Sequence, residues 1–402
     1  MAGPFGRAYE RDKVCETHNS RMLLYLVLGD LVRITPLNTI FDNKYIVENH
    51  ERIYLQMDAV WLCNYTYHCP AELVNGLLQR EYPVKLNGKA EMSSSFDTYL
   101  IEPIKGNSLG DYTQRKANLE RTDVFDSLDT DDCFEYSCTV SDIYSYICEK
   151  YALGTATQSF HSGIQTDSFT LLYTKDGKIA SKQSEIGTVY CNYCINSDKS
   201  LRNDYGRKIA FQKDNHAMVL YSPVSKETRI KELKLDVYFS NYEELIKEIY
   251  IEDKSVDISY FREGNILRTQ LQSFFFNMNS IYCHLKPAVN KKDLEDAFVE
   301  IKAENGVLII SIYNYKNEEK LFKKKEIRSI TNGFLFDVED AKDLSFGEFC
   351  SIYKKSNVID SVICNPHTRY TLMREVKYEC NKVKLSCCVS PVTNGIRYIS
   401  LR

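Results

Sequence analysis

The feature that most constrains this chain is a pair of apolar segments separated by Asn305-Gly306. Residues 298–303 alternate between apolar and polar side chains, whereas residues 307–313 are apolar almost throughout. Asn-Gly is a strong hairpin signal, because both residues accept the positive φ that a tight two-residue turn needs. The pattern predicts two antiparallel strands, of which the second is covered on both faces.

Other local signals also predict β structure in the later part of the chain. Residues 169–180 have the pattern of a strand, a turn and a second strand, and further hairpins are predicted at Asn87-Gly88, Asn332-Gly333 and Asn394-Gly395. Ser345 and Glu348 have the spacing of a capping box, which predicts a short helix to about residue 355.

Helices are predicted mainly in the N-terminal third. Ser20 caps a helix to residue 32, Pro70 opens one to residue 79, and Ser141 caps one over residues 142–153 that Gly154 stops. Two more helices are expected at 242–252 and 266–285, and the aromatic run 274–276 inside the second is expected in the core.

These elements predict an α+β fold with a mainly helical N-terminal third, followed by antiparallel β-hairpin regions with interspersed helices. The 402 residues are too many for one ordinary core. We expect a mainly helical domain at 1–155, a mixed α+β domain at 156–285 and a β-rich C-terminal domain at 286–402.

Cysteine usage indicates the compartment. The chain has 14 cysteines scattered along its length, and its first apolar run, residues 22–28, is too short for a membrane span. A disulfide scaffold is typical of short secreted chains. We therefore expect an intracellular protein, in the nucleus or cytoplasm of a host cell, without membrane contact.

Close Cys/His spacing points to a structural zinc ion. Cys191 and Cys194 form the one Cys-x-x-Cys pair, and Cys364 with His367 has the same spacing. Two intervening residues let both ligands reach one tetrahedral zinc. Because the pairs lie far apart in the sequence, the fold would have to bring them together. The alternative is that these cysteines are small buried apolar residues.

Basic residues are concentrated locally although the net charge is −4. Residues 199–234 hold nine lysines and arginines against four acidic residues, and residues 367–402 hold seven against two. Tyr205, Phe211, Tyr370, Tyr378 and Tyr398 are interleaved, as stacking platforms for single strands would be. The alternative is an ordinary solvated face. The residues predicted to contact nucleic acid are Lys199, Arg202, Arg207, Lys208, Lys323, Lys324, Lys325, Arg369 and Arg374.

Catalytic motifs are absent from the sequence: it has no Walker loop, no G-x-G-x-x-G and no G-x-S-x-G. Frequent Ile, Lys, Asn and Tyr are typical of A/T-rich genomes such as those of large DNA viruses. In size and residue usage the chain is similar to the late-transcription subunit of baculovirus RNA polymerases, although no motif accompanies the similarity.

The preferred hypothesis is a non-catalytic subunit of a large intracellular assembly that handles DNA or RNA together with other protein subunits. An accessory subunit of a viral multisubunit RNA polymerase acting in late transcription is one such protein. Two alternatives remain open: a virion structural protein of the capsid or tegument, and an enzyme with a metal site assembled by the fold.

Overall fold

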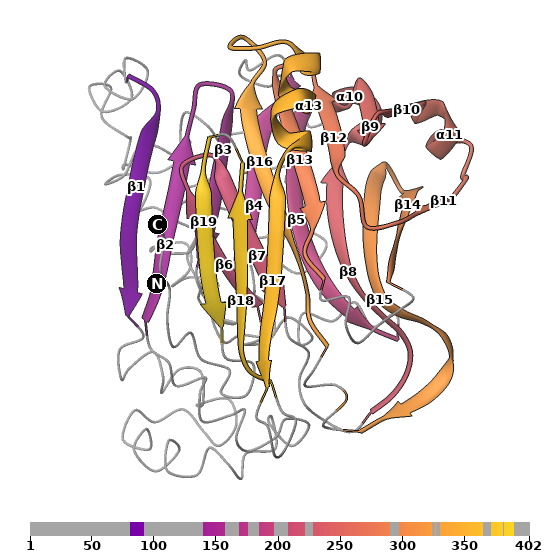
Figure 1. The fold of residues 1–402 in the computed structure, drawn as a ribbon. Helices are drawn as coiled ribbons and strands as arrows, with labels where there is room; N and C mark the ends of the chain where they lie inside the picture. Colours follow the sequence, from indigo (N-terminus) through magenta and orange to yellow (C-terminus); the bar gives the residue numbers. More distant parts are fainter. Residues whose placement is uncertain are drawn as a thin grey trace, which may run out of the picture.

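The computed structural model describes the following parts of the chain (Figure 1): residues 81–91, 140–156, 169–175, 185–196, 208–221, 228–289, 297–323, 326, 330–364, 371–380 and 382–389. None of the helices in these parts is long and apolar enough to cross a membrane.

The largest element is a nine-stranded sheet in which every neighbouring pair of strands is antiparallel. In spatial order its strands are β1 (Val84–Glu91), β2 (Val140–Ile147), β3 (Tyr151–Ala156), β4 (Phe169–Thr174), β5 (Ile186–Ile195), β8 (Thr228–Ser240), β15 (Val307–Phe322), β14 (Phe298–Glu304) and β11 (Leu267–Thr269).

Two smaller sheets and three short helices complete the described fold. The seven-stranded sheet has the order β10 (Lys254–Val256), β9 (Glu248–Ile251), β12 (Phe274–Met278), β13 (Ile281–Pro287), β16 (Asn332–Asp340), β7 (His216–Tyr221) and β6 (Lys208–Lys213). The three-stranded sheet has the order β17 (Asn357–Cys364), β18 (Thr371–Glu379) and β19 (Lys384–Val389). The helices are α10 (Tyr242–Leu245), α11 (Ile258–Arg262) and α13 (Phe346–Lys354).

The seven-stranded sheet is the middle layer, and strand alternation divides its side chains between two cores. Phe334 and Phe336 of β16 belong to the core shared with the nine-stranded sheet, where Phe336 contacts Phe239 of β8. Leu335, between them, belongs to a second core with α13 and the three-stranded sheet. Because both faces are covered, inner strands of this layer such as β7 and β12 are buried along nearly their whole length.

Several sequence predictions are confirmed. The apolar segments around Asn305-Gly306 are β14 and β15, and both turn residues have positive φ. Ser345 and Glu348 form the capping box of α13, with both reciprocal bonds present. The aromatic run Phe274 to Phe276 is fully buried, although it lies in a strand rather than in a helix.

The predicted fold class is wrong, because the described residues are mostly antiparallel sheet. The segment expected as a helix over 142–153 is the hairpin of β2 and β3. The segment 266–285 is β11, β12 and β13, and the segment 242–252 is helical only in α10 before β9 begins. Apolar runs covered on both faces do not distinguish a strand from a buried helix, and pairing with distant strands decided the outcome. The helices predicted at 20–32 and 70–79 lie outside the described residues.

Two of the Asn-Gly pairs predicted as hairpins lie inside strands. Asn87 and Gly88 pair with Tyr144 and Ile143 of β2. Asn332 begins β16, and its buried side-chain amide donates hydrogen bonds to the Ile312 carbonyl at 3.0 Å and to Asn314 Oδ1 at 2.8 Å. Asn332 therefore serves as a buried hydrogen-bond donor and not as a turn residue. Asn394-Gly395 lies outside the described residues.

The predicted segments 1–155, 156–285 and 286–402 each contribute strands to the nine-stranded sheet, among them β2, β5 and β15. One sheet therefore joins residues from all three segments, and their division into separate domains stays a prediction.

Candidate nucleic-acid interface

Strands β8 and β15 continue beyond the nine-stranded sheet as a two-stranded ribbon. β5 pairs with β8 only from Leu233 onward, and β14 pairs with β15 only as far as Tyr313. β8 and β15 remain paired with each other to Thr228 and Phe322, with a bulge in β15 between Lys316 and Lys320. We call residues 228–232 and 315–323 the ribbon; its two strands curve away from the sheet at the lower right of Figure 1.

The two faces of the ribbon differ in burial. On one face Ile230 is fully buried and Phe322 is nearly so, and both belong to the core of the two large sheets. The other face consists of side chains that are all exposed, and we call it the exposed ribbon face: Arg229, Lys231, Glu319, Leu321 and Lys323. It therefore carries three cations, one carboxylate and one large apolar side chain.

An ion pair on this face joins Arg229 Nη1 to Glu319 Oε1 at 3.4 Å, and the Arg229 side chain is 71% exposed. Leu321 lies directly opposite Arg229 in the strand register and is 43% exposed. A solvent-exposed ion pair contributes little to stability, so the guanidinium can exchange this partner for an external anion at small cost.

Asn196, just after β5, holds the first strand of the ribbon. Its side-chain oxygen accepts hydrogen bonds from the backbone N–H groups of Lys231 at 2.7 Å and Glu232 at 3.3 Å. Its amide nitrogen donates to the Arg229 carbonyl at 2.7 Å. The Asn196 side chain thus makes the backbone hydrogen bonds that an adjacent strand would make, and it fixes the backbone that carries Arg229 and Lys231.

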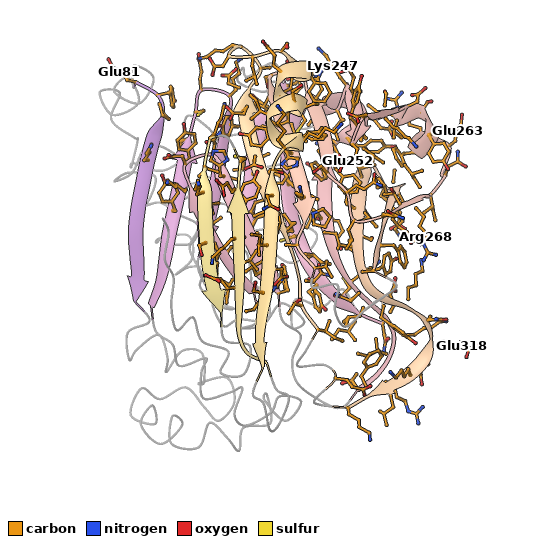
Figure 2. All side chains as sticks on the ribbon, viewed as in Figure 1. Glu81, Lys247, Glu252, Glu263, Arg268 and Glu318 are labelled. Atoms are coloured by element: carbon orange, nitrogen blue, oxygen red, sulfur yellow. The ribbon has the colours of Figure 1, made fainter. Side chains whose placement is uncertain are left out.

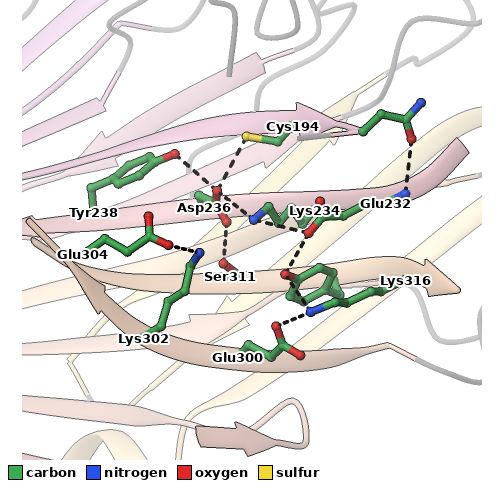
Figure 3. A network of polar contacts seen from close by, with 12 residues as sticks. Cys194, Glu232, Lys234, Asp236, Tyr238, Glu300, Lys302, Glu304, Ser311 and Lys316 are labelled. Atoms are coloured by element: carbon green, nitrogen blue, oxygen red, sulfur yellow. Dashed lines mark hydrogen bonds and ion pairs between the residues drawn. The ribbon is translucent and has the colours of Figure 1, made fainter. Parts of the chain in front are cut away.

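A buried polar network lies where the ribbon joins the sheet (Figure 3). Asp236 of β8 is 1% exposed, and its carboxylate accepts hydrogen bonds from Ser311 at 2.6 Å and Tyr238 at 3.2 Å. Lys234 lies between this carboxylate, at 3.3 Å, and that of Glu232, at 3.4 Å. Burial lowers the pKa of Lys234, but the two carboxylates outweigh this and leave its pKa raised, so the ammonium keeps its charge.

Tyr313 connects this network to β14. Its hydroxyl donates to Glu232 at 2.9 Å, and the ammonium groups of Lys234 and Lys316 lie 5.4 and 4.8 Å from its ring centroid. Lys316 in turn pairs with Glu300 at 2.6 Å. These contacts immobilise the base of the ribbon, so that the cations beyond it are presented on a fixed support.

The structure brings the end of the basic segment 199–234 together with Lys323, another of the predicted nucleic-acid contacts. Residues 228–234, the end of the first segment, pair with the end of β15, and Lys323 follows directly with its side chain exposed. Lys208 lies in β6, where its side chain is not described. Six of the predicted contacts lie outside the described residues: Lys199, Arg202, Arg207, Lys324, Lys325 and Arg369.

The basic segment 367–402 contributes Arg374, which lies in the three-stranded sheet rather than in the ribbon. Arg374 of β18 is fully buried, and its guanidinium pairs with Asp360 at 2.6 Å and donates to the carbonyls of Asn332 and Ala288, both at 2.9 Å. This guanidinium joins the three-stranded sheet to the middle layer. Of the predicted stacking residues, Phe211 and Tyr378 are buried, and Tyr205, Tyr370 and Tyr398 lie outside the described residues.

Cys191 and Cys194 do not share a face of β5, because residues three apart in a strand point to opposite sides. Cys191 Sγ lies 3.2 Å from the Tyr221 hydroxyl, whereas Cys194 Sγ donates to Asp236 at 3.6 Å. Cys364 lies in β17 and its side chain is not described, and His367 lies outside the described residues. In the described part of the chain no three His, Cys, Asp or Glu residues are placed to hold a metal ion. The structural zinc stays a prediction.

One buried polar cluster was not anticipated from the sequence. Asp337 of β16, fully buried, accepts hydrogen bonds from His216 Nδ1 at 2.6 Å, His284 Nδ1 at 2.8 Å and the Tyr378 hydroxyl at 2.6 Å. Burial alone raises the pKa of Asp337, but the two histidines outweigh it and hold this pKa at about 2. These residues come from β7, β13, β16 and β18, so only strand pairing could reveal the cluster.

No family model and no curated protein matches the chain. Among solved structures, two of a heparinase III gene product, one with methylated lysines, are 10% and 9% identical, with TM-scores of 0.30 and 0.29. Each alignment covers 93% of this chain and 62% of that one, so the chain spans less than two thirds of their length. A further crystal structure of heparinase III is 9% identical, with a TM-score of 0.27, over 95% of this chain and 68% of the other. Similarities at these values carry no inference about fold or function.

Proposed function

We propose that the protein is a non-catalytic subunit of an intracellular assembly that handles nucleic acid, and that the ribbon is its nucleic-acid contact. One observation carries the proposal. Arg229 and Lys231, from the basic segment 199–234, and Lys323, from the basic run 323–325, meet on one exposed ribbon face through the pairing of β8 with β15. Such a surface attracts a polyanion by releasing the counterions condensed on its phosphates.

The support beneath this face favours binding rather than an ordinary solvated surface. The side chain of Asn196 and the buried network around Asp236 hold both strands in place. Ordering a flexible basic loop would cost conformational entropy on binding, whereas a ribbon that is already ordered does not lose this freedom.

Within the assembly, the chain acts as an accessory subunit, for which a viral multisubunit RNA polymerase active in late transcription is the working example. Its partners are other protein subunits, and its compartment is the nucleus or the cytoplasm of the host cell. The similarity in size and residue usage supports this part of the proposal, and the ribbon does not bear on it.

The test is nucleic-acid binding by the full chain, measured with fluorescently labelled fragments of mixed sequence at two salt concentrations. We expect the affinity to fall steeply with salt and to fall again in the double charge reversal Arg229→Glu/Lys323→Glu. Lys247→Glu is the matched control, because Lys247 is an exposed lysine at the opposite end of the molecule from the ribbon residue Glu318 (Figure 2). Binding that the double reversal leaves unchanged would overturn the proposal.

Membership of an assembly needs a separate measurement. Native mass spectrometry of the chain purified from its own source should give a defined hetero-complex. A shell or a large homo-oligomer of this chain alone would instead favour a virion structural protein.

A further inference from the structure

We infer that the nucleic acid that the ribbon binds is double-stranded B-form DNA, entered through the major groove. The inference rests on the proposed function and specifies its ligand. It follows from the dimensions of the ribbon, from the chemistry of the exposed ribbon face, and from the burial of the nearby aromatic rings.

The shape of the ribbon fits the major groove of B-form DNA. Among the described residues, the ribbon beyond Leu233 and Tyr313 consists of two strands paired with each other, with a bulge between Lys316 and Lys320. Neighbouring strands lie about 4.8 Å apart. The major groove of B-form DNA is about 12 Å wide and admits a two-stranded ribbon with its side chains. The major groove of A-form RNA is deep and narrow and excludes such an element.

The order of side chains on the exposed ribbon face also fits the major groove. Arg229 and Leu321 lie directly opposite each other, so both would face the floor of the groove. An arginine can donate two hydrogen bonds to guanine, and an apolar side chain can contact the methyl group of thymine. Lys231 and Lys323, also exposed, flank this pair and are long enough to reach phosphates at the rims. An exposed leucine between cations suits a groove floor better than a phosphate backbone.

Proteins bind single strands mainly by stacking the bases on aromatic side chains. The ribbon has two aromatic residues, and neither is presented for stacking. Phe322 is 5% exposed, with the Lys320 ammonium 4.9 Å from its ring centroid. Tyr315 packs edge-on against Phe322 at 5.1 Å, and its hydroxyl donates to the Glu318 carbonyl at 2.6 Å. The exposed ribbon face itself carries no aromatic ring among the residues described.

The test compares three labelled ligands of one sequence with the full chain by fluorescence anisotropy: a DNA duplex of about 20 base pairs, the matching RNA duplex and one DNA strand. We expect the DNA duplex to bind at least about tenfold more tightly than the other two. Arg229→Glu/Lys323→Glu should lower that affinity by about tenfold or more, whereas Lys247→Glu should leave it within about twofold. Far-ultraviolet circular dichroism of each variant verifies that the sheets are intact.

Leu321→Ala separates groove reading from simple charge attraction. We expect it to reduce the preference between duplexes of different sequence while leaving the salt dependence of binding unchanged. If the RNA duplex or the single strand binds as tightly as the DNA duplex, and Arg229→Glu/Lys323→Glu weakens that binding, the DNA assignment fails and the proposed function stands. If none of the three ligands binds, or if the double reversal has no effect, both fail.

Discussion

The contact between Gly187 and Tyr173 makes a sharp test of the described packing. Gly187 of β5 lies directly opposite Tyr173 of β4, and the tyrosine ring covers the glycine. A Cβ atom at residue 187 would lie 2.0 Å from Tyr173 Cζ, 2.3 Å from Cε1 and 2.5 Å from Oη. All three distances are shorter than any normal contact, so Gly187→Ala forces the ring to move.

The ring has little room to move, because Tyr173 is 2% exposed and belongs to the core between the two large sheets. Its hydroxyl has no hydrogen-bond partner among the described residues, so no bond holds the ring and none is lost when it shifts. Overpacking a well-packed core costs about 1–3 kcal/mol. Because a whole ring must be displaced, we expect Gly187→Ala to lower the free energy of unfolding by about 3 kcal/mol, the upper end of that range.

Urea unfolding of the full chain, followed by circular dichroism, measures this change as a shift of the midpoint. Gly347→Ala in α13 is the matched control, since a Cβ atom there has nothing within 4 Å; its effect should be within about 0.5 kcal/mol of zero or favourable. In a Tyr173→Leu background, which removes the atoms that clash, the added cost of Gly187→Ala should fall below about 1 kcal/mol. An equal cost in both backgrounds, or no cost in the wild type, would refute the packing.

Three further predictions concern the buried polar groups and the helix cap. The lowered pKa of His284 and that of Asp337, about 2, both make acid destabilising. The stability that the neutral His284 contributes is complete above about pH 6.5 and is lost below it. The stability that the ionised Asp337 contributes, about 2 kcal/mol, is present above about pH 3.9 and is lost as the pH falls toward 2. Urea unfolding measured across this pH range should show that Asp337→Asn lacks the loss of stability at the lower pH. Arg374→Met leaves the Asp360 carboxylate and two buried carbonyls without their donor, so chemical denaturation should show a loss of about 3–5 kcal/mol. Ser345→Ala removes the side-chain cap of α13 and should cost about 1 kcal/mol by the same measurement, whereas Ser345→Asp should cost less.

The parts of the fold that could be predicted depend on neighbours in the sequence. The turn at Asn305-Gly306 and the cap at Ser345 are set by residues within four positions of each other. The hairpin of β2 and β3 could not be recognised in this way. Leu153 of β3 is buried in the core shared with the seven-stranded sheet, and a buried helix would give the same apolar pattern.

In the candidate site, too, the sequence shows some features and strand pairing alone reveals the others. The excess of positive charge in residues 199–234 and at 323–325 is visible in the sequence, but their meeting depends on the pairing of β8 with β15. Arg374 was predicted to contact nucleic acid because it lies in the locally basic segment 367–402, but its side chain is fully buried. Its buried partners, Asp360 of β17 and the carbonyls of Asn332 and Ala288, come from other elements of the fold.

The central claim is that the ribbon touches nucleic acid, and photo-crosslinking tests it most directly. The full chain is irradiated with a DNA duplex that carries 5-bromouracil in place of thymine, and crosslinked peptides are identified by mass spectrometry. We predict crosslinks within residues 228–232 and 315–323, with Leu321 and its neighbours the most heavily modified. Crosslinks confined to the three-stranded sheet, at residues 371–380 and 382–389, would contradict the assignment of the ribbon as the contact surface.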